Sequence, residues 1–261
     1  MSRKKRKKRS SQRGIYILPN LFTSANLFCG FYAIIAAIQG SFVESAIAIM
    51  VAALFDGLDG KIARVTRTVS QFGLEYDSLS DAISFGVAPG ILVYLWALQP
   101  FGRVGWLGAF VFVACGTLRL ARFNTLAGRV SGEYFVGLPI PTAAFMVAAT
   151  VLLLDRLGGA GTSKHVTIPI MIYVLSFLMV STIKYHSFKK ASLFKQMKFN
   201  MLVLVVLVCI VIAAEPSISF FLMAFVYILS GPFTALWFRR KKNAEEHVSD
   251  RPENTPSEES L

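Results

Sequence analysis

Long apolar runs separated by short polar stretches dominate the chain. The runs are roughly 17 to 25 residues long, and each can cross a bilayer core of about 30 Å. They predict eight membrane-spanning helices, at about 16–38, 42–62, 77–98, 104–124, 136–155, 166–184, 200–214 and 217–238. Because the connections are short, we expect these helices to form one bundle. The run at 200–214 is short and ends at Glu215–Pro216.

Composition agrees with this pattern. The 261 residues are 54% hydrophobic and 16% charged, whereas an average soluble domain is about 25% charged. The cysteines, Cys29, Cys115 and Cys209, lie inside apolar runs without metal-ligand spacing, and we interpret them as packing residues. The predicted fold class is an all-α polytopic membrane protein with about eight transmembrane helices in one bundle.

The basic residues predict the orientation of the helices. The formal net charge is +12, and eight basic residues lie in the first thirteen positions. If both ends of the chain are cytoplasmic, 24 of the 27 Lys and Arg residues fall in cytoplasmic segments, and only Arg103, Arg156 and Lys164 do not. Such an excess is typical of cytoplasmic loops. An excess of basic residues can also indicate a nucleic-acid-binding protein. The sequence shows no folded nucleic-acid-binding module, so we expect no nucleic-acid partner.

The chain divides into three predicted regions. Residues 1–14 form a basic cytoplasmic arm suited to acidic lipid headgroups, and the basic runs also serve as simple topology anchors. Residues 15–238 form the transmembrane domain. Residues 239–261 end in a polar, acidic stretch without periodicity, which we expect to be a disordered cytoplasmic tail.

Five of the 15 acidic residues fall between Asp56 and Asp81. Ionisable residues at or within membrane spans are costly and are candidates for function. Asp56 and Asp59 are three positions apart at the end of the second span, so they share one helical face. Asp77 and Asp81, four apart at the start of the third span, likewise share a face. Because the two helices are antiparallel neighbours, the four carboxylates can converge near the cytoplasmic membrane boundary.

Such a cluster points to phosphoryl-transfer chemistry. Four carboxylates in a small volume repel one another unless they are protonated or bind a divalent cation. Oxygen ligands without a nearby His or Cys favour Mg²⁺ or Mn²⁺. Gly60 and Gly73 let a ligand approach closely, and Lys61, Arg64 and Arg67 are donors for phosphate oxygens. The alternative is a salt-bridge network between the acids and the two arginines.

Two segments carry a family resemblance. Residues 56–64, DGLDGKIAR, are followed after a short gap by residues 73–81, GLEYDSLSD. Together they resemble the signature of the CDP-alcohol phosphotransferases, D-x-x-D-G-x-x-A-R and then G-x-x-x-D-x-x-x-D, at all eight fixed positions. These membrane enzymes transfer a phosphatidyl-type group from a CDP-linked donor to an alcohol and release CMP.

The resemblance implies roles for the acidic residues. Asp56, Asp59, Asp77 and Asp81 would hold one or two divalent metals, Mg²⁺ or Mn²⁺, with Asp56 and Asp77 as bridging ligands. Asp81 would also be the general base that takes the proton from the attacking hydroxyl. The family resemblance further implies a homodimer. With the basic residues on the cytoplasmic side, we expect a prokaryotic cell membrane protein whose active site faces the cytoplasm.

The resemblance also implies a nucleotide site. Gly60 and Arg64 would contact the nucleotide and its phosphates, and Ser70 supplies a hydroxyl nearby. Residues 19–23, PNLFT, are similar to the P-N-x-x-T element of the family, which adds Asn20 and Thr23. The alternative for this element is a helix that begins at proline and has a polar first turn.

The acceptor is indicated by two further strings. Residues 119–124, RLARFN, and 137–141, GLPIP, resemble the phosphatidylserine synthase branch of the family, as does the opening segment with Asn26 and Gly30. This branch implies CDP-diacylglycerol and serine as substrates. Arg119 and Arg122 could clamp the serine carboxylate, or they could be topology anchors.

Other functions remain open on the sequence alone. The same chemistry could use glycerol 3-phosphate, inositol or choline, with Lys61, Arg67 or Arg129 binding a phosphorylated acceptor. An ion-coupled transporter using the aspartates and a catalytically silent membrane scaffold are further alternatives.

Overall fold

A computed structural model of the chain describes residues 17–66, 70–126, 134–158, 165–186 and 213–249, together with residues 207 and 210. Within these ranges, helices account for nearly all of the regular structure. The elements are α2 (Ile17–Ile38), α3 (Phe42–Thr66), α4 (Gln71–Asp81), the π-helical η1 (Ala82–Val87), α5 (Ala88–Val93), the π-helical η2 (Tyr94–Leu98), the 3₁₀ turn η3 (Gln99–Phe101), α6 (Arg103–Leu126), β1 (Tyr134–Val136), α7 (Ile140–Arg156), α8 (Thr167–Val180), β2 (Lys184–His186) and α10 (Pro216–Ser249).

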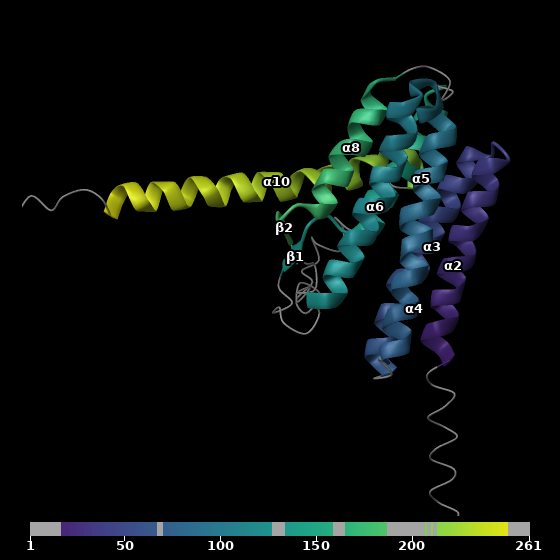
Figure 1. Cartoon of the computed structure of the whole chain (residues 1–261), viewed down its shortest axis with the longest axis horizontal. Coiled ribbons are helices and arrows are strands. Elements are labelled where there is room, and N and C mark those ends of the chain that lie inside the picture. Colours follow the sequence, from purple (N-terminus) through teal and green to yellow (C-terminus); the bar gives the residue numbers. More distant parts are fainter. Residues whose placement is uncertain are drawn as a thin grey trace, which may run out of the picture.

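The helices from α2 to α8 run up and down beside one another (Figure 1). Four described segments are long and apolar enough to cross a membrane, namely Leu18–Ile38, Gln71–Phe101, Arg103–Thr125 and Pro216–Thr234. The segment Gln71–Phe101 joins α4, η1, α5, η2 and η3 into one continuous span. A helical, multi-span membrane protein is thereby confirmed. The predicted number of eight spans is not, and most of the predicted span 200–214 lies outside the described residues.

Two short strands are a departure from the all-α prediction. β1 and β2 pair antiparallel, with Tyr134 opposite His186. Gly137 follows β1 with a φ of 81°, a conformation that favours glycine, and its N–H donates to the Ile183 carbonyl at 2.9 Å. The chain is therefore extended, and not helical, at the start of the predicted span 136–155 and at the end of the predicted span 166–184. The first of these helices begins only at Ile140, after Pro139.

Helix α10 is longer than the sequence pattern indicated. It continues to Ser249, so the predicted disordered tail at 239–261 begins with helix; residues 250–261 lie outside the described part of the chain. Residues 239–249 are rich in Lys, Arg, Ala and Glu, which favour helix even where no apolar face is present. In Figure 1, α10 crosses the other helices and extends beyond them.

Small residues let α2 and α3 pack closely. Ala33, Ala37, Ala46 and Ala52 are all buried in the core, which continues through large side chains such as Phe85. Alanine at such positions brings two backbones together, a common arrangement in membrane helices. The polar groups of α2 that face this packed interior must therefore find partners on neighbouring helices, since neither lipid nor water is available to them.

Candidate active site

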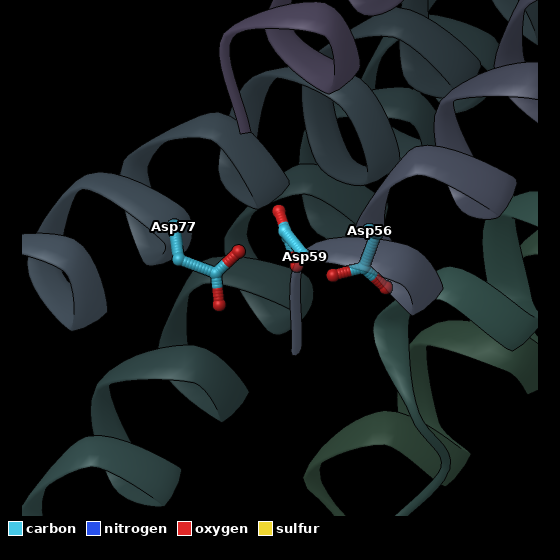
Figure 2. A group of neighbouring side chains, drawn as sticks. All are labelled: Asp56, Asp59 and Asp77. Atoms are coloured by element: carbon cyan, nitrogen blue, oxygen red, sulfur yellow. The ribbon is translucent and has the colours of Figure 1, made fainter. Parts of the chain in front are cut away.

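Three of the predicted carboxylates meet between α3 and α4. Asp56, Asp59 and Asp77 each offer an oxygen within 4.8 Å of those of the other two. Figure 2 shows the carboxyl groups of Asp56 and Asp77 turned towards each other from the two helices, with Asp59 between them in this view. The spacing of three positions along α3 places Asp56 and Asp59 about one turn apart on one face of the helix. Three of the four predicted carboxylates are thus close together in the fold.

Asp81 lies beside this group. It is only 7% exposed, and its carboxylate interacts electrostatically with those of Asp56 and Asp77. The amide of Asn26 on α2 donates to Asp81 Oδ1 at 3.0 Å. The π-helical segment η1 begins immediately after Asp81; single π-helical turns occur frequently at functional sites. Asp81 is therefore adjacent to the three-carboxylate cluster and hydrogen-bonded to α2.

Helix α2 holds the carboxylate of α3 as well. The Thr23 hydroxyl donates to Asp59 Oδ2 at 2.9 Å, and it also lies 3.2 Å from the Pro19 carbonyl of its own helix. Thr23 is 3% exposed. The hydroxyl is therefore buried between Asp59 and the Pro19 carbonyl, and a nucleotide contact of Thr23 stays a prediction.

Residues of α4 and η1 bind back to the α2 backbone. Ser80 donates to the Thr23 carbonyl at 3.2 Å, and Ser84 donates to the Asn26 carbonyl at 3.0 Å. Gly30 makes this approach possible, because a Cβ there would lie 2.7 Å from the Ser84 Cα and would collide with its hydroxyl. The side of α2 that carries Thr23, Asn26 and Gly30 is thus fixed against the acidic residues.

Two of the predicted nucleotide-site residues, Asn20 and Ser70, meet beside Gly73 at the start of α4. Ser70 is the N-cap of this helix, and its hydroxyl accepts a hydrogen bond from the Gly73 N–H at 3.0 Å. A Cβ on Gly73 would lie 3.1 Å from Ser70 Oγ and 3.4 Å from Asn20 Oδ1. A side chain at position 73 would push the Ser70 hydroxyl by a few tenths of an ångström, so glycine favours this close approach.

Gly60 and Arg64 lie on the last turns of α3. Around Gly60 there is open space, since a Cβ there would meet only the Arg64 guanidinium at 3.8 Å. The Nε of Arg64 donates to the Gly60 carbonyl at 2.7 Å. Among the described residues the one salt bridge joins Arg156 to Glu215, so Arg64 does not neutralise the aspartates. Arg67 lies outside the described residues, and the salt-bridge alternative receives no support from Arg64.

The acidic cluster fits a hard divalent cation. Its donors are carboxylate oxygens, the ligands that Mg²⁺ and Mn²⁺ prefer. Asp77 Oδ1 is buried and accepts no hydrogen bond from any described residue. A buried carboxylate oxygen without a donor is costly, and a metal ion is one way to satisfy it. Asp56, Asp59 and Asp77 would hold such an ion, with Asp81 at its edge.

The two predicted acceptor arginines have different surroundings. Arg119 on α6 is 8% exposed, interacts electrostatically with Asp81 and lies near Tyr227 of α10. Its Nε is buried and has no hydrogen-bond partner in the described part of the chain. Arg122, one turn further along, instead donates to the Val180 carbonyl at the end of α8, at 3.4 Å. The structure thus brings Arg119, and not Arg122, to the acidic site.

Comparison with known proteins agrees with this geometry. The sequence model of CDP-alcohol phosphatidyltransferases matches residues 16–180, which include α2, the acidic residues and Arg119. The chain belongs to this family. The two segments that resemble the family signature, residues 56–64 and 73–81, lie on α3 and α4 of this fold.

Curated relatives in the CDP-alcohol phosphatidyltransferase family cover most of the chain. The CDP-diacylglycerol--serine O-phosphatidyltransferase of Helicobacter pylori is 38% identical over 208 residues, which are 80% of this chain and 87% of the relative. The enzyme of the same name from Methanocaldococcus jannaschii is 33% identical over 222 residues, 85% of this chain and 95% of the relative. The archaetidylserine synthase of Methanothermobacter thermautotrophicus is 40% identical over 170 residues, 64% of this chain and 69% of the relative.

The family signature does not contain every residue that shapes the site. Asn26 entered the sequence argument only as part of the resemblance, and Ser80 and Ser84 did not enter it at all, yet they connect α2 to the acidic helices. A signal was present, because Asn20, Thr23 and Asn26 are spaced three positions apart within an apolar run. Polar residues on one face of a membrane helix need partners inside the protein.

Proposed function

We propose that this protein transfers the phosphatidyl group of CDP-diacylglycerol to the hydroxyl of L-serine, giving phosphatidylserine and CMP. The serine Oγ forms a new bond to the phosphatidyl phosphorus, and the bond from that phosphorus to the oxygen of CMP breaks. The observation that carries the proposal is the buried guanidinium of Arg119 beside Asp81, in a family whose members transfer such groups.

The metal site fits the proposed donor. Asp56, Asp59, Asp77 and Asp81 would hold Mg²⁺ or Mn²⁺, and the three-carboxylate cluster supports this assignment. When bound, the metal would neutralise charge on the phosphate oxygens of the donor and on the departing CMP. Without a metal the carboxylates would repel the negatively charged diphosphate. The diphosphate can therefore lie beside them only where a bound cation separates the two.

Asp81 is the proposed general base. Its position next to the cluster but outside the closest group of three supports a second role, because one oxygen can face the acceptor hydroxyl. In the proposed reaction the serine hydroxyl proton moves to Asp81 as the new phosphorus–oxygen bond forms. The guanidinium of Arg119 attracts the Asp81 carboxylate from α6.

The nucleotide would lie between the ends of α2, α3 and α4. Asn20 and Ser70 flank Gly73, and the open space at Gly60 would admit the nucleotide close to the backbone. Arg64, which is exposed, would reach the phosphates from α3. Thr23 would act on this site through Asp59.

Serine is the acceptor that Arg119 favours. A serine carboxylate would give Arg119 Nε the partner that it lacks among the described residues, and a buried guanidinium without such a partner is costly. The names of the Helicobacter and Methanocaldococcus relatives add support, since both name serine. Inositol and choline carry no carboxylate that could pair with this guanidinium.

We also propose the setting of the reaction. The predicted excess of basic residues on one side places the active site at the cytoplasmic face of a prokaryotic cell membrane, with both termini on that side. The protein would act as a homodimer among membrane lipids, without nucleic acid. Cross-linking of the purified protein in detergent tests the dimer, and a labelling scan of engineered cysteines in whole cells tests the orientation.

The decisive experiment follows both products. Protein purified in detergent is incubated with CDP-diacylglycerol, labelled serine and Mg²⁺ or Mn²⁺, and CMP and labelled lipid are measured for wild type and Asp77→Ala. Metal-dependent phosphatidylserine formation that is lost in the variant is expected. CMP release stimulated by glycerol 3-phosphate, inositol or choline in place of serine would reassign the acceptor. The absence of CMP with every acceptor would reject the proposed activity and leave an ion-coupled transporter as the alternative.

A further inference from the structure

The side chain of Asn26 is completely buried in α2, and its Nδ2 donates to Asp81 Oδ1 at 3.0 Å. We propose that Asn26 is a positioning residue for the transfer reaction: it fixes the orientation of the Asp81 carboxylate, so that the other oxygen, Oδ2, faces the acceptor hydroxyl. This inference rests on the proposed function, because it assigns to Asn26 the task of orienting the proposed base.

The hydrogen bonding of Asn26 is one-sided. Its Oδ1 is buried and has no hydrogen-bond partner among the described residues. A buried acceptor left without a donor costs about 1 to 3 kcal/mol. An apolar residue of similar size, such as leucine, would avoid that cost. An amide at this position therefore leaves one buried oxygen unsatisfied. The hydrogen bond that its N–H donates to Asp81 is the interaction that explains why an amide is present.

The direction of the amide is set by the same contact. With the amide reversed, its oxygen would face an oxygen of Asp81, and two acceptors would meet without a proton between them whenever the carboxylate is ionised. No described hydrogen bond engages Asp81 Oδ2, whereas Oδ1 accepts from Asn26. The two oxygens of Asp81 are thereby made different, and Oδ2 is the one available to a substrate.

The backbone of Asn26 is held as firmly as its side chain. Its carbonyl accepts from the Ser84 hydroxyl at 3.0 Å, and one turn along α2 the close contact of Gly30 with Ser84 leaves no room for sliding. Ser84 lies on η1, directly after Asp81 in the chain. The amide and the carboxylate are therefore mounted on two elements that are locked together at this point.

Asp81 needs such a restraint because several charges act on it. Asp56, Asp59 and Asp77 repel its carboxylate from the side of α3 and α4. Arg119 attracts it from α6. Without Asn26, this repulsion and attraction alone would set the side-chain angle of Asp81. Both act on the carboxylate as a whole and do not distinguish Oδ1 from Oδ2. The hydrogen bond from Asn26 supplies that selectivity.

The test compares Asn26→Leu with Ser45→Ala in full-length protein in detergent. Leucine keeps the volume and removes the donor to Asp81, whereas Ser45→Ala removes a buried hydrogen bond of 2.7 Å from α3 to the Ala33 carbonyl of α2, eleven positions before Asp56. For Asn26→Leu we expect kcat, measured as CMP release with the acceptor that stimulates the wild type, to fall about 10- to 100-fold, the range for residues that orient a ligand. KM for CDP-diacylglycerol and for the acceptor should stay within about threefold, which is the sign of a lost orientation as opposed to a lost binding contact.

The Ser45→Ala control should lower the melting temperature but keep kcat within about threefold, an effect confined to packing. Equal loss of kcat in both variants would show that Asn26 acts through helix packing and would overturn the inference. So would a wild-type kcat in Asn26→Leu. If the leucine variant does not elute as a monodisperse protein, Asn26→Ser decides, since it keeps a shorter donor: a kcat below wild type with unchanged KM values supports the role, and a wild-type kcat overturns it.

The proposed function can fail separately from this inference. If the wild type releases no CMP with any acceptor, the proposed function is wrong, and the positioning role of Asn26 is rejected with it. If the wild type releases CMP and the variants behave alike, only the role of Asn26 is rejected.

Discussion

Thr23 and Asp59, which are 36 positions apart in the sequence, join α2 to α3 at the acidic site through a hydrogen bond of 2.9 Å. The hydroxyl donates and the carboxylate accepts, so Asp59 Oδ2 is fixed from α2. The polar residues of α2 therefore orient the carboxylates of the cluster in addition to any contact that they make with the nucleotide.

Replacing Thr23 by valine should weaken metal use. Valine has nearly the same shape but donates no hydrogen bond, so Asp59 loses its orientation while packing is kept. We expect the concentration of Mn²⁺ that supports half-maximal activity to rise about 10- to 100-fold, the usual effect of removing a partner of a metal ligand. Thr23→Ser, which keeps the hydroxyl, is the control and should stay near wild type. An unchanged metal dependence in Thr23→Val would mean that the hydroxyl contributes nothing to Asp59.

Removal of the metal, or of one carboxylate, should abolish turnover. Treatment with a chelator is expected to stop CMP release, and added Mg²⁺ or Mn²⁺ should restore it. Asp77→Asn should lose both activity and tight Mn²⁺ binding measured by electron paramagnetic resonance. The reason is that the buried Asp77 Oδ1 would no longer be a negatively charged metal ligand. Glu75→Gln, an exposed acid two positions earlier on α4, is the matched control and should bind Mn²⁺ as the wild type does. Tight Mn²⁺ binding by Asp77→Asn would place the metal elsewhere.

The sequence predicted the acidic site well because its geometry is local. Spacings of three and four positions place Asp56 with Asp59, and Asp77 with Asp81, on single helical faces whatever the rest of the fold does. The link from Asn26 to Asp81 could not be predicted in this way. It depends on how α2 rotates against η1, and that rotation is set by the contact between Gly30 and Ser84. A polar residue in an apolar run indicates that a partner exists but does not identify it.

The different surroundings of Arg119 and Arg122 also could not be predicted, because they depend on how α6 packs against the neighbouring helices. Arg119 and Arg122 are one turn apart on α6, so the sequence assigned them one role. Position relative to the neighbouring helices separates them: Arg119 is inside the bundle near Asp81, and Arg122 is close to the end of α8. The short strands were missed for a related reason, since three residues are too few to show an alternating pattern.

Substitution of Arg119 should affect the use of serine selectively. We expect Arg119→Met, which keeps much of the side-chain volume, to lower kcat/KM for serine by about 30-fold or more, since losing one partner of a buried charge pair costs about 2 kcal/mol or more. KM for CDP-diacylglycerol should change much less. Arg122→Met removes an equal charge that binds the Val180 carbonyl, so it should leave the kinetics of serine near wild type. Equal effects of the two substitutions on serine would indicate a general role of positive charge and not a carboxylate site.

Gly137 offers a test of the fold that is independent of the chemistry. Its φ is 81°, and a Cβ there would collide with the Met179 carbonyl oxygen and lie 3.1 Å from that of Ser181. Gly137→Ala therefore combines a strained backbone with a clash at the junction of β1, α7 and α8. The expected cost is about 2 to 5 kcal/mol, the sum of a left-handed conformation and an overpacked contact.

Gly40 is the matched control, because it has a similar φ of 80° but would place a Cβ in open space. Gly40→Ala should cost only the backbone term, about 1 to 2 kcal/mol. Melting temperatures in detergent should therefore fall in the order wild type, Gly40→Ala, Gly137→Ala. Equal melting temperatures for the two variants would show that the chain from 137 to 140 can move away from Met179. The hydrogen bonds from Gly137 to the Ile183 carbonyl and from Leu138 to the Leu178 carbonyl would then not hold this junction.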